Sequence, residues 1–242
     1  MAKKQAIKRR GRPVRLADHA LDKQQIVNSA VALIDRDGLE GFSLRQLARH
    51  LGVFPTALYW HLPGGRNELL GEVAATAFQN VAKPFKAGDD WTVWLRELFR
   101  RYRTSLHGHP NIAPLLGAQL VSNSGVNPKL VEQILAVLKV AGFSGQRLVD
   151  AYNAVVAAML GFVTLELAPV PAEDPTNWAS RFRESISSLD PAQFPNLTDH
   201  MALMANRAFI TRWESGSQNP LNSGFELYLE TVIGGLRGLA DR

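Results

Sequence analysis

The sequence predicts an all-α protein in which an N-terminal three-helix helix-turn-helix head joins a larger helical domain. Apolar residues recur at three- and four-residue spacing along most of the 242-residue chain, and no convincing series of alternating residues indicates strands. Short apolar stripes precede the Pro- and Gly-containing stretch at 83–90, and longer ones follow it. We therefore expect a basic flexible arm at 1–20, a head at 21–82 and a second domain at 83–242.

The composition is that of a globular chain, with 46% hydrophobic and 20% charged residues, which excludes general disorder. The absence of cysteine excludes disulfides, Cys-ligated zinc and a Cys nucleophile, and it favours a reducing, cytoplasmic location. The most apolar run, 154–165, is too short to span a bilayer, so no membrane partner is expected. No apolar stretch follows the basic N-terminus, so we expect no secretory signal.

Positive charge is concentrated in the arm. Seven of the 27 Lys and Arg residues lie in the first fifteen positions, which hold no acid, and the remainder carries 20 cations against 22 acids. This distribution favours contact with a polyanion, although a solvated tail without a partner is the alternative. Arg10 and Arg12 stand in an Arg-Gly-Arg-Pro string that matches the core of an AT-hook, whose arginines lie in the minor groove. A tail that only adds phosphate attraction fits the string as well.

Four short helices are expected in the head. Ser43 and Gln46 form a capping-box signal for the second helix, which ends near Gly52. Pro55 suits the first turn of the third helix, because its missing N–H has no partner there in any case. The sequence places the four helices at about 26–37, 44–51, 55–61 and 67–81.

Residues 43–61 have the helix-turn-helix pattern, with small Ala48 in the first helix and Gly52 at the corner. The apolar underside consists of Leu47, Leu51, Val53 and Leu58. The second helix of the motif is expected to enter a major groove of double-stranded DNA. We expect this helix to direct Thr56, Tyr59 and His61 toward bases or phosphates and Ala57 toward a thymine methyl. Arg45, on the preceding helix, is expected to reach guanine or phosphate. The alternative is an ordinary helical corner with Tyr59 and Trp60 packed inside.

From about Leu21 to Val81 the chain resembles the DNA-binding head of the tetracycline-repressor (TetR) family. The resemblance rests on Ile26-Val27 with Ala30, Gly38 to Arg45, Leu47-Ala48, Leu51 to Val53, Ala57 to His61 and Leu69-Leu70. It implies DNA contacts from Arg45, Pro55, Thr56, Ala57, Tyr59 and His61. The family's phosphate-binding Lys at the start of the fourth helix is matched most nearly by Arg66, after a Pro63-Gly64-Gly65 loop that is one residue longer than usual.

The second domain is expected to contain long helices. One apolar stripe runs from Trp91 to Leu106, shorter helices follow at about 110–119 and 130–138, and the last runs over 221–239. The segment 144–167 is apolar on two faces, which predicts that one face meets the core and the other a second subunit in a homodimer. Prolines interrupt the stretch 169–220, for which no elements are assigned.

This second domain resembles the ligand-binding and dimerisation domain of the tetracycline-repressor subgroup. The resemblance rests on His109-Pro110, Val140 to Phe143, Gly161 with Glu166, Phe225 to Leu227 and Gly235-Leu236. The histidine that binds the drug's magnesium in that subgroup aligns with Leu116, so an apolar or aromatic small-molecule effector is expected in place of metal–tetracycline. Candidate pocket walls are Trp94, Phe99, Tyr102, Leu116, Gln119, Tyr152, Asn153, Val156 and Met159. Plain core packing is the alternative for each, and Arg103, His107 and Asn153 are the candidate polar contacts.

No metal site, cofactor or catalytic group is expected. His107 and His109 are two residues apart, so they point to different sides of a helix, and no pair of carboxylates completes a ligand set. The chain offers no nucleophile–base pairing, P-loop or dinucleotide glycine pattern. The sequence therefore predicts a homodimeric transcriptional regulator, a repressor released from its operator by a small molecule. An architectural DNA-binding protein with little sequence preference and a helical enzyme with an incidental basic arm are the alternatives.

Overall fold

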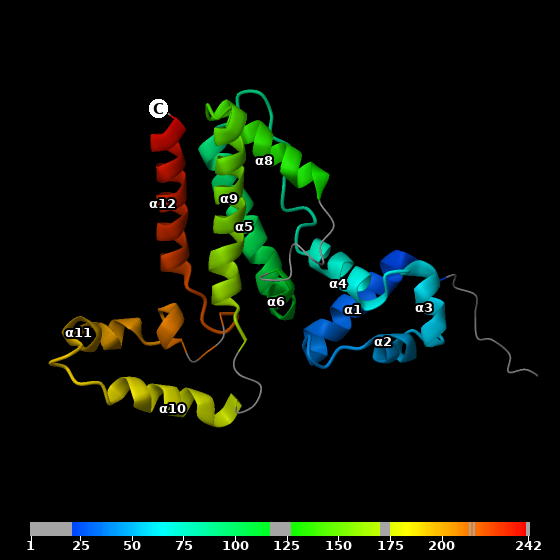
Figure 1. Ribbon diagram of the computed structural model, residues 1–242, viewed down its shortest axis with the longest axis horizontal. Helices are drawn as coiled ribbons and strands as arrows, with labels where there is room; N and C mark the ends of the chain where they lie inside the picture. The colour runs from blue at the N-terminus through cyan, green and yellow to red at the C-terminus, as the bar shows by residue number, and fades with distance from the viewer. Residues whose placement is uncertain (1–20, 117–126, 170–174, 213, 215, 241–242) are drawn as a thin grey trace, which may run out of the picture.

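The structure is a computed structural model that describes residues 21–116, 127–169, 175–212, 214 and 216–240. Within these ranges the chain is helical with irregular connections and contains no strand, which confirms the predicted all-α class. Four short helices gather at one end of the molecule, beside a body of longer helices (Figure 1). The predicted site residues Arg10, Arg12 and Gln119 lie outside the described residues.

The head consists of α1 (Lys23–Asp37), α2 (Leu44–His50), α3 (Pro55–His61) and α4 (Gly65–Thr76). Helix α1 begins with a reciprocal capping box. The Gln25 N–H donates to Asp22 Oδ1 at 2.7 Å, and the Asp22 N–H donates to Gln25 Oε1 at 3.3 Å. The predicted cap of α2 is only half formed, because the Gln46 N–H donates to the Ser43 hydroxyl while the Gln46 side chain accepts from that hydroxyl instead of from a backbone N–H.

The predicted range of the fourth helix, 67–81, was wrong at both ends. Helix α4 begins two residues earlier because Glu68 Oε2 accepts the Gly64 N–H at 2.9 Å, which satisfies a donor of the first turn. It ends at Thr76, after which the chain makes a series of turns in which Asn80 adopts a φ of 60°. The extra loop residue, Gly65, is therefore part of the helix.

The body is built around three long helices that lie side by side, α5 (Trp91–Gly108), α9 (Gly145–Glu166) and α12 (Asn222–Ala240), with α8 (Pro128–Val140) packed across α5 and α9 (Figure 1). The stripe predicted for α5 is confirmed, since Trp94, Leu95, Leu98, Phe99, Tyr102 and Leu106 are all buried. On α12 the buried residues are Phe225, Leu229, Ile233 and Leu236. The remaining elements are η1 (Pro110–Ile112), α6 (Ala113–Leu116), α10 (Pro175–Ser187), α11 (Pro195–Met204) and η2 (Phe209–Thr211).

The end of α1 is held against the body by side chains that follow α5. The Asn111 amide donates to the carbonyls of Ile34 and Asp35 at 3.1 and 3.0 Å. His109 Nδ1 lies 2.7 Å from Asp35 Oδ2. Because Asn111 satisfies two carbonyls of the last turn of α1, the head is joined to the body by specific hydrogen bonds as well as by apolar packing.

Asn111→Ala tests this junction. The substitution removes the Asn111 donor from both carbonyls, although the Ile34 carbonyl keeps its bond from the Gly38 N–H, so we expect the free energy of unfolding to fall by about 1–3 kcal/mol. Urea unfolding followed by circular dichroism measures the change. Asn28→Ala, at an exposed position of α1, is the matched control and should change stability by less than about 0.5 kcal/mol. Equal stability of the two variants would show that the Asn111 contacts do not hold the head.

Candidate nucleic-acid interface and ligand pocket

Helix α3 is anchored through one face only. Leu58 and Leu62 are each 1% exposed, and the small residue Ala48, also 1% exposed, allows α2 to cross closely. At the corner, Gly52 has a φ of 67°, a conformation that favours glycine, and the Val53 N–H donates to the Ala48 carbonyl at 3.0 Å. These contacts hold α3 as the second helix of a helix-turn-helix, with its opposite face directed to solvent.

The solvent-directed face carries the predicted contact residues. Pro55 and Thr56 are exposed, and Tyr59 is 51% exposed. Ala57 and His61 are half-buried at the sides of the helix, and Arg45 is exposed on α2. Trp60 is 86% exposed, so the alternative in which the rings of Tyr59 and Trp60 pack inside a helical corner is wrong.

No site role was predicted for Trp60 or for Phe54, which precedes α3 directly and is 83% exposed. Large apolar side chains at such exposure form no part of the core, which makes them candidates for an external contact. The sequence did contain a signal for such a role, because Phe54 stands directly before a helix, where a polar capping residue is normally found.

The start of α4 lies directly beneath the ring of Tyr59. An added Cβ at Gly65 would come within 3.2 Å of Tyr59 Cε1, and Gly65 has a φ of 62°. Glycine therefore permits both the tight turn and the close approach of the ring. Arg66 is the next residue and is exposed, so the first turn of α4 presents a cation to solvent.

In the body, the carboxylate of Glu166 joins three elements. Arg103 donates to both of its oxygens, from Nε at 2.8 Å and from Nη2 at 2.6 Å, and His107 Nε2 lies 3.0 Å from Oε2. The Leu221 N–H donates to Oε1 at 2.7 Å, and the Arg103 guanidinium also stacks over the Phe225 ring at 4.6 Å. Two of the three predicted polar contacts, Arg103 and His107, are thus already engaged within the protein.

Glu166 is ionised although its side chain is fully buried. Burial raises the pKa of a carboxyl group, but the hydrogen bonds from Arg103, His107 and the Leu221 backbone outweigh burial and lower the pKa of Glu166 to about 2. The cluster also shows that His107 and His109 face different partners, Glu166 and Asp35, and do not converge on a common point.

The predicted pocket walls differ in how far they are buried. Phe99, Tyr102, Leu116 and Met159 are buried, and Tyr152 and Val156 are half-buried, whereas Asn153 is exposed. Trp94 is buried, and its indole N–H donates at 2.9 Å to the carbonyl of Lys83, which lies in the connection between α4 and α5. The Tyr102 ring stacks on Phe78 at 5.4 Å, and within the described part of the chain the Tyr102 hydroxyl is buried without a hydrogen-bond partner. Burial raises the pKa of Tyr102, so this hydroxyl keeps its proton and is available as a donor.

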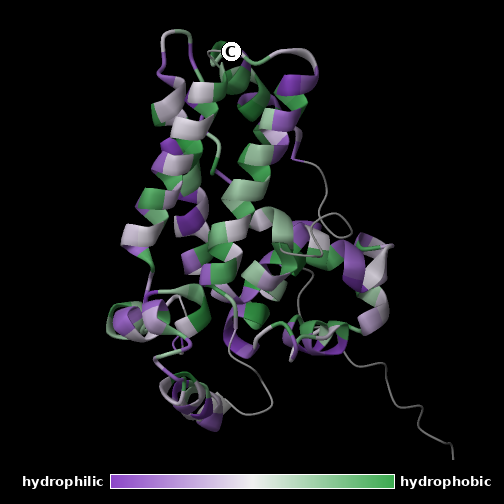
Figure 2. Cartoon of the chain, turned by 60° about the vertical axis from the view of Figure 1, so that its left-hand side comes forward, coloured by the Kyte–Doolittle hydropathy of each residue, from purple (hydrophilic) through white to green (hydrophobic). Residues whose placement is uncertain are grey.

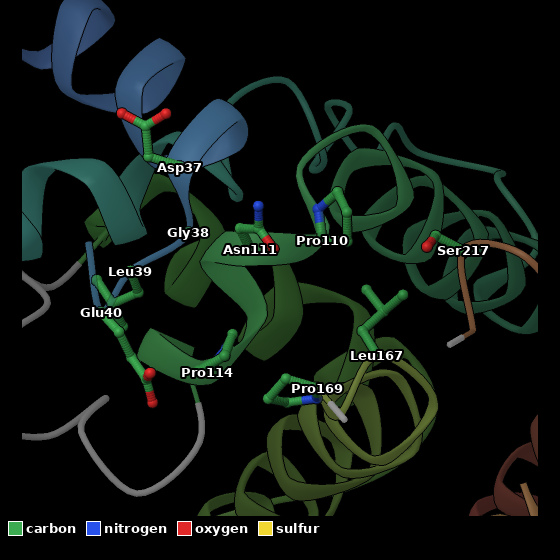
Figure 3. Close-up of a pocket in the computed structure, with 10 residues that line it drawn as sticks. All are labelled: Asp37, Gly38, Leu39, Glu40, Pro110, Asn111, Pro114, Leu167, Pro169 and Ser217. Atoms are coloured by element: carbon green, nitrogen blue, oxygen red, sulfur yellow. The ribbon is translucent and has the colours of Figure 1, made fainter. Parts of the chain in front are cut away.

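A separate cavity of about 450 Å³ lies between the head and the body (Figure 3). Its walls are mostly apolar, and its size is within the range of small-molecule pockets, which often lie at domain boundaries. It adjoins the Asn111 contact that holds the end of α1. The lining residues are Asp37, Gly38, Leu39 and Glu40 from the head, and Pro110, Asn111, Pro114, Leu167, Pro169 and Ser217 from the body.

A helix-turn-helix head with a bare recognition face, carried on a helical body, defines a DNA-binding regulator. Two family models match the chain: bacterial regulatory proteins of the tetR family over residues 26–73, and the tetracyclin repressor-like C-terminal domain over residues 83–239. The chain belongs to the TetR family of transcriptional regulators. It is therefore a DNA-binding transcription factor with a ligand-binding C-terminal domain and not an enzyme.

Curated relatives support the assignment. A helix-turn-helix-type transcriptional regulator of Saccharopolyspora erythraea is 30% identical over 146 residues, which are 60% of this chain and 61% of that protein. The chain thus matches about three fifths of the length of that relative. The class D tetracycline repressor of Escherichia coli is 27% identical over 225 residues, 88% of this chain and 93% of the repressor.

Two solved structures have a similar fold along most of the chain. ActR of Streptomyces coelicolor, in complex with actinorhodin, has a TM-score of 0.69 and 25% identity and covers 92% of this chain and 99% of its own. BioQ of Mycobacterium smegmatis, with its double-stranded DNA operator, has a TM-score of 0.60 and 26% identity and covers 90% and 98%.

Tyr59→Ala tests the recognition face. Because the Tyr59 side chain is half exposed, its removal should weaken operator binding by roughly 10- to 100-fold while the melting temperature stays nearly constant. Fluorescence anisotropy and calorimetry measure the two quantities. Val93→Ala, at a 52%-exposed position of α5, should change neither. A large fall in melting temperature for Tyr59→Ala would assign the ring to the core instead.

Glu166→Gln tests the buried cluster through its pH dependence. The pKa of Glu166 in the folded protein, about 2, lies below the usual value near 4.3, so ionisation contributes about 3 kcal/mol of stability. This contribution is complete above about pH 5 and is lost as the pH falls toward 2. We expect Glu166→Gln to lower the free energy of unfolding at pH 7 by about 3 kcal/mol and to flatten its decline in acid.

Urea unfolding between pH 3 and pH 7 measures both effects. The matched control is Glu230→Gln, which breaks a more exposed pair with Arg96 that joins α5 to α12. Exposed pairs contribute little, so this variant should lie within about 1 kcal/mol of the wild type. An unchanged acid profile in Glu166→Gln would contradict the assigned role of the carboxylate.

Proposed function

We propose that the protein is a homodimeric, cytoplasmic transcriptional repressor that leaves its operator when a small apolar or aromatic effector binds in the helical body. The observation that carries the proposal is the exposed face of α3, where Thr56 and Tyr59 stand in solvent although Leu58 between them is buried. A helix held from below with a bare outer face is the arrangement that a major groove accepts.

On the operator, each residue has a distinct place. Thr56, Tyr59 and Pro55 face the base edges, Ala57 lies near a thymine methyl, and His61 closes the helix beside the backbone. Arg45 on α2 and Arg66 on α4 bind guanine or phosphate from either side. Arg10 and Arg12 reach the adjacent minor groove, where the narrow A·T-rich form attracts cations. These assignments rest on exposure for the described residues and on the sequence pattern for the arm.

The dimer interface is proposed on α9 and α12. Helix α9 is long and apolar enough to cross a membrane by composition, yet only 28% of its most apolar window is buried within the subunit. Hydrophobic stretches recur along the long helices of the body and alternate with more polar ones (Figure 2). Among the described residues, no atom beyond the adjacent backbone of α12 lies within 4 Å of the position of a Cβ on Gly234 or Gly235, so α12 permits the close approach of another helix. The exposed apolar side chains of the two helices are Val149, Leu165, Leu227 and Leu239.

The effector site is proposed around Tyr102 in the centre of α5. Phe99, Leu116 and Met159 supply apolar walls, and Val156 and Tyr152 border them from α9. The Tyr102 hydroxyl, buried and unpaired within the described residues, would orient a ligand with one acceptor group. The complex of ActR with actinorhodin supports the proposal that a small molecule binds in the body. Asn153, Arg103, His107, Trp94 and Gln119 complete the candidate set.

Release of DNA follows from differential affinity. An effector that binds more tightly to the arrangement in which the two heads no longer match successive major grooves shifts the population toward that arrangement. Tyr102 and the junction residues Asn111 and His109 lie on α5 and in the segment that follows it, so a change at the pocket has a short route to α1.

Selection of bound fragments from a random duplex pool at physiological salt tests the proposal. A repressor dimer recovers a near-palindrome, with half-sites about one helical turn apart. Recovery of A·T-rich fragments without symmetry would instead indicate an architectural protein that depends on the arm. The recovered sequence then serves as the operator in the release assays.

Tyr102→Phe tests the effector site, with actinorhodin-like aromatic compounds as the first probes. The substitution removes a buried hydroxyl that has no partner in the described residues, so stability should stay constant or rise. The concentration of effector needed for release should increase roughly 10-fold, the loss of one hydrogen bond in a dry site. Tyr228→Phe, which removes a bonded hydroxyl (2.8 Å to the Ala158 carbonyl), should lower stability by about 1 kcal/mol and leave release unchanged. The opposite pattern would contradict the site.

A further inference from the structure

Phe54 occupies the position before the first turn of α3 and contributes nothing to its stability. Its side chain is 83% exposed, and α3 begins without any side-chain cap. Ser, Thr, Asp or Asn at this position would satisfy a free N–H of the first turn and stabilise the helix. A large apolar ring in solvent is therefore not explained by the fold, which favours a role in contact with another molecule.

The surroundings of Phe54 are suited to DNA. Residues 41–67 contain no acid, and within them Arg45, Arg49 and Arg66 are exposed. A surface of this charge binds a polyanion in preference to an apolar protein partner. Recognition helices place their N-terminal residues against the base edges, so the ring of Phe54 would stand over bases rather than beside the backbone.

The major groove offers one apolar group to such a ring, the 5-methyl group of thymine. We propose that Phe54 is a specificity-determining residue that reads a thymine methyl in each half-site of the operator. The inference rests on the proposed function and deepens it, because it adds to the contact of Ala57 a second methyl contact, from a residue outside the proposed contact set. A 5-methylcytosine at the same position offers the same methyl group and satisfies the same contact.

A thymine-to-deoxyuridine scan of the selected operator tests the assignment, because deoxyuridine lacks only the methyl group. With the wild-type protein, one substituted position in a half-site should weaken binding about fourfold, the effect of burying one methyl-sized group. Phe54→Ala should bind thymine and deoxyuridine operators equally at that position. It should keep its response to deoxyuridine at the other positions.

Phe54→Ser provides a variant that cannot fail through unfolding, because serine restores the helix cap and should raise the melting temperature. It should nevertheless lose the discrimination at the same position. Leu203→Ala, which removes a 66%-exposed apolar side chain from α11, should leave the whole scan unchanged.

The outcomes separate the two levels of the argument. If the wild-type protein selects no operator, the proposed function fails before Phe54 is tested. If it selects one, and the fourfold preference for thymine persists in Phe54→Ala and Phe54→Ser, the assignment to Phe54 is overturned. A uniform loss of affinity in both variants, equal for thymine and deoxyuridine at every position, would also overturn it, since it would place the ring on the sugar–phosphate backbone.

Discussion

The buried carboxylate of Glu166 is the interaction on which the arrangement of the body depends. It fixes Arg103 and His107 of α5 to the end of α9 and, through the Leu221 N–H, to the start of α12. An ionised group at full burial is tolerated only when every neighbouring donor is aligned, so the relative positions of the three elements are tightly restricted. Just beyond α5, Asn111 and His109 hold α1. Helix α5 is therefore fixed by Glu166, and the segment that follows α5 contacts the head.

This arrangement gives a physical basis for coupling between pocket and head. Tyr102 lies on α5 one residue before Arg103, so a ligand that moves its ring acts on the helix next to the Glu166 cluster. Because buried ion pairs are broken at high cost, the helix is more easily displaced as a unit than deformed locally. The junction cavity beside Asn111 leaves space on the head side of this unit. The dimer proposed on α9 and α12 converts such a displacement into a change in the spacing of two heads.

Much of the fold was predictable because its signals are local. Gly52 and Ala48 define the corner, Ser43 begins the second helix, and the stripe on α5 defines its buried face. Local patterns do not contain contacts between distant segments. The engagement of Arg103 and His107 by Glu166, about sixty residues away in the sequence, could not be predicted from them. The start of α4 depended on a bond from Gly64 to Glu68, which periodicity does not report. The exposure of Trp60 could also be learned only from the fold, because the apolar character of its ring predicts burial.

Four features that depart from ordinary folding rules lie at positions proposed to meet a partner. Phe54 leaves a helix uncapped, Trp60 exposes an indole, and the Tyr102 hydroxyl is unpaired among the described residues. The outer face of α9 is apolar where a solvent-facing helix is normally polar. Each feature lowers the stability of the isolated subunit, and each becomes favourable when its expected partner is present: DNA for the two rings, an effector for the hydroxyl and a second subunit for α9. Natural sequences depart from local consistency mainly at functional sites. The four departures coincide with the three binding surfaces that the proposed ligand-controlled dimeric repressor requires.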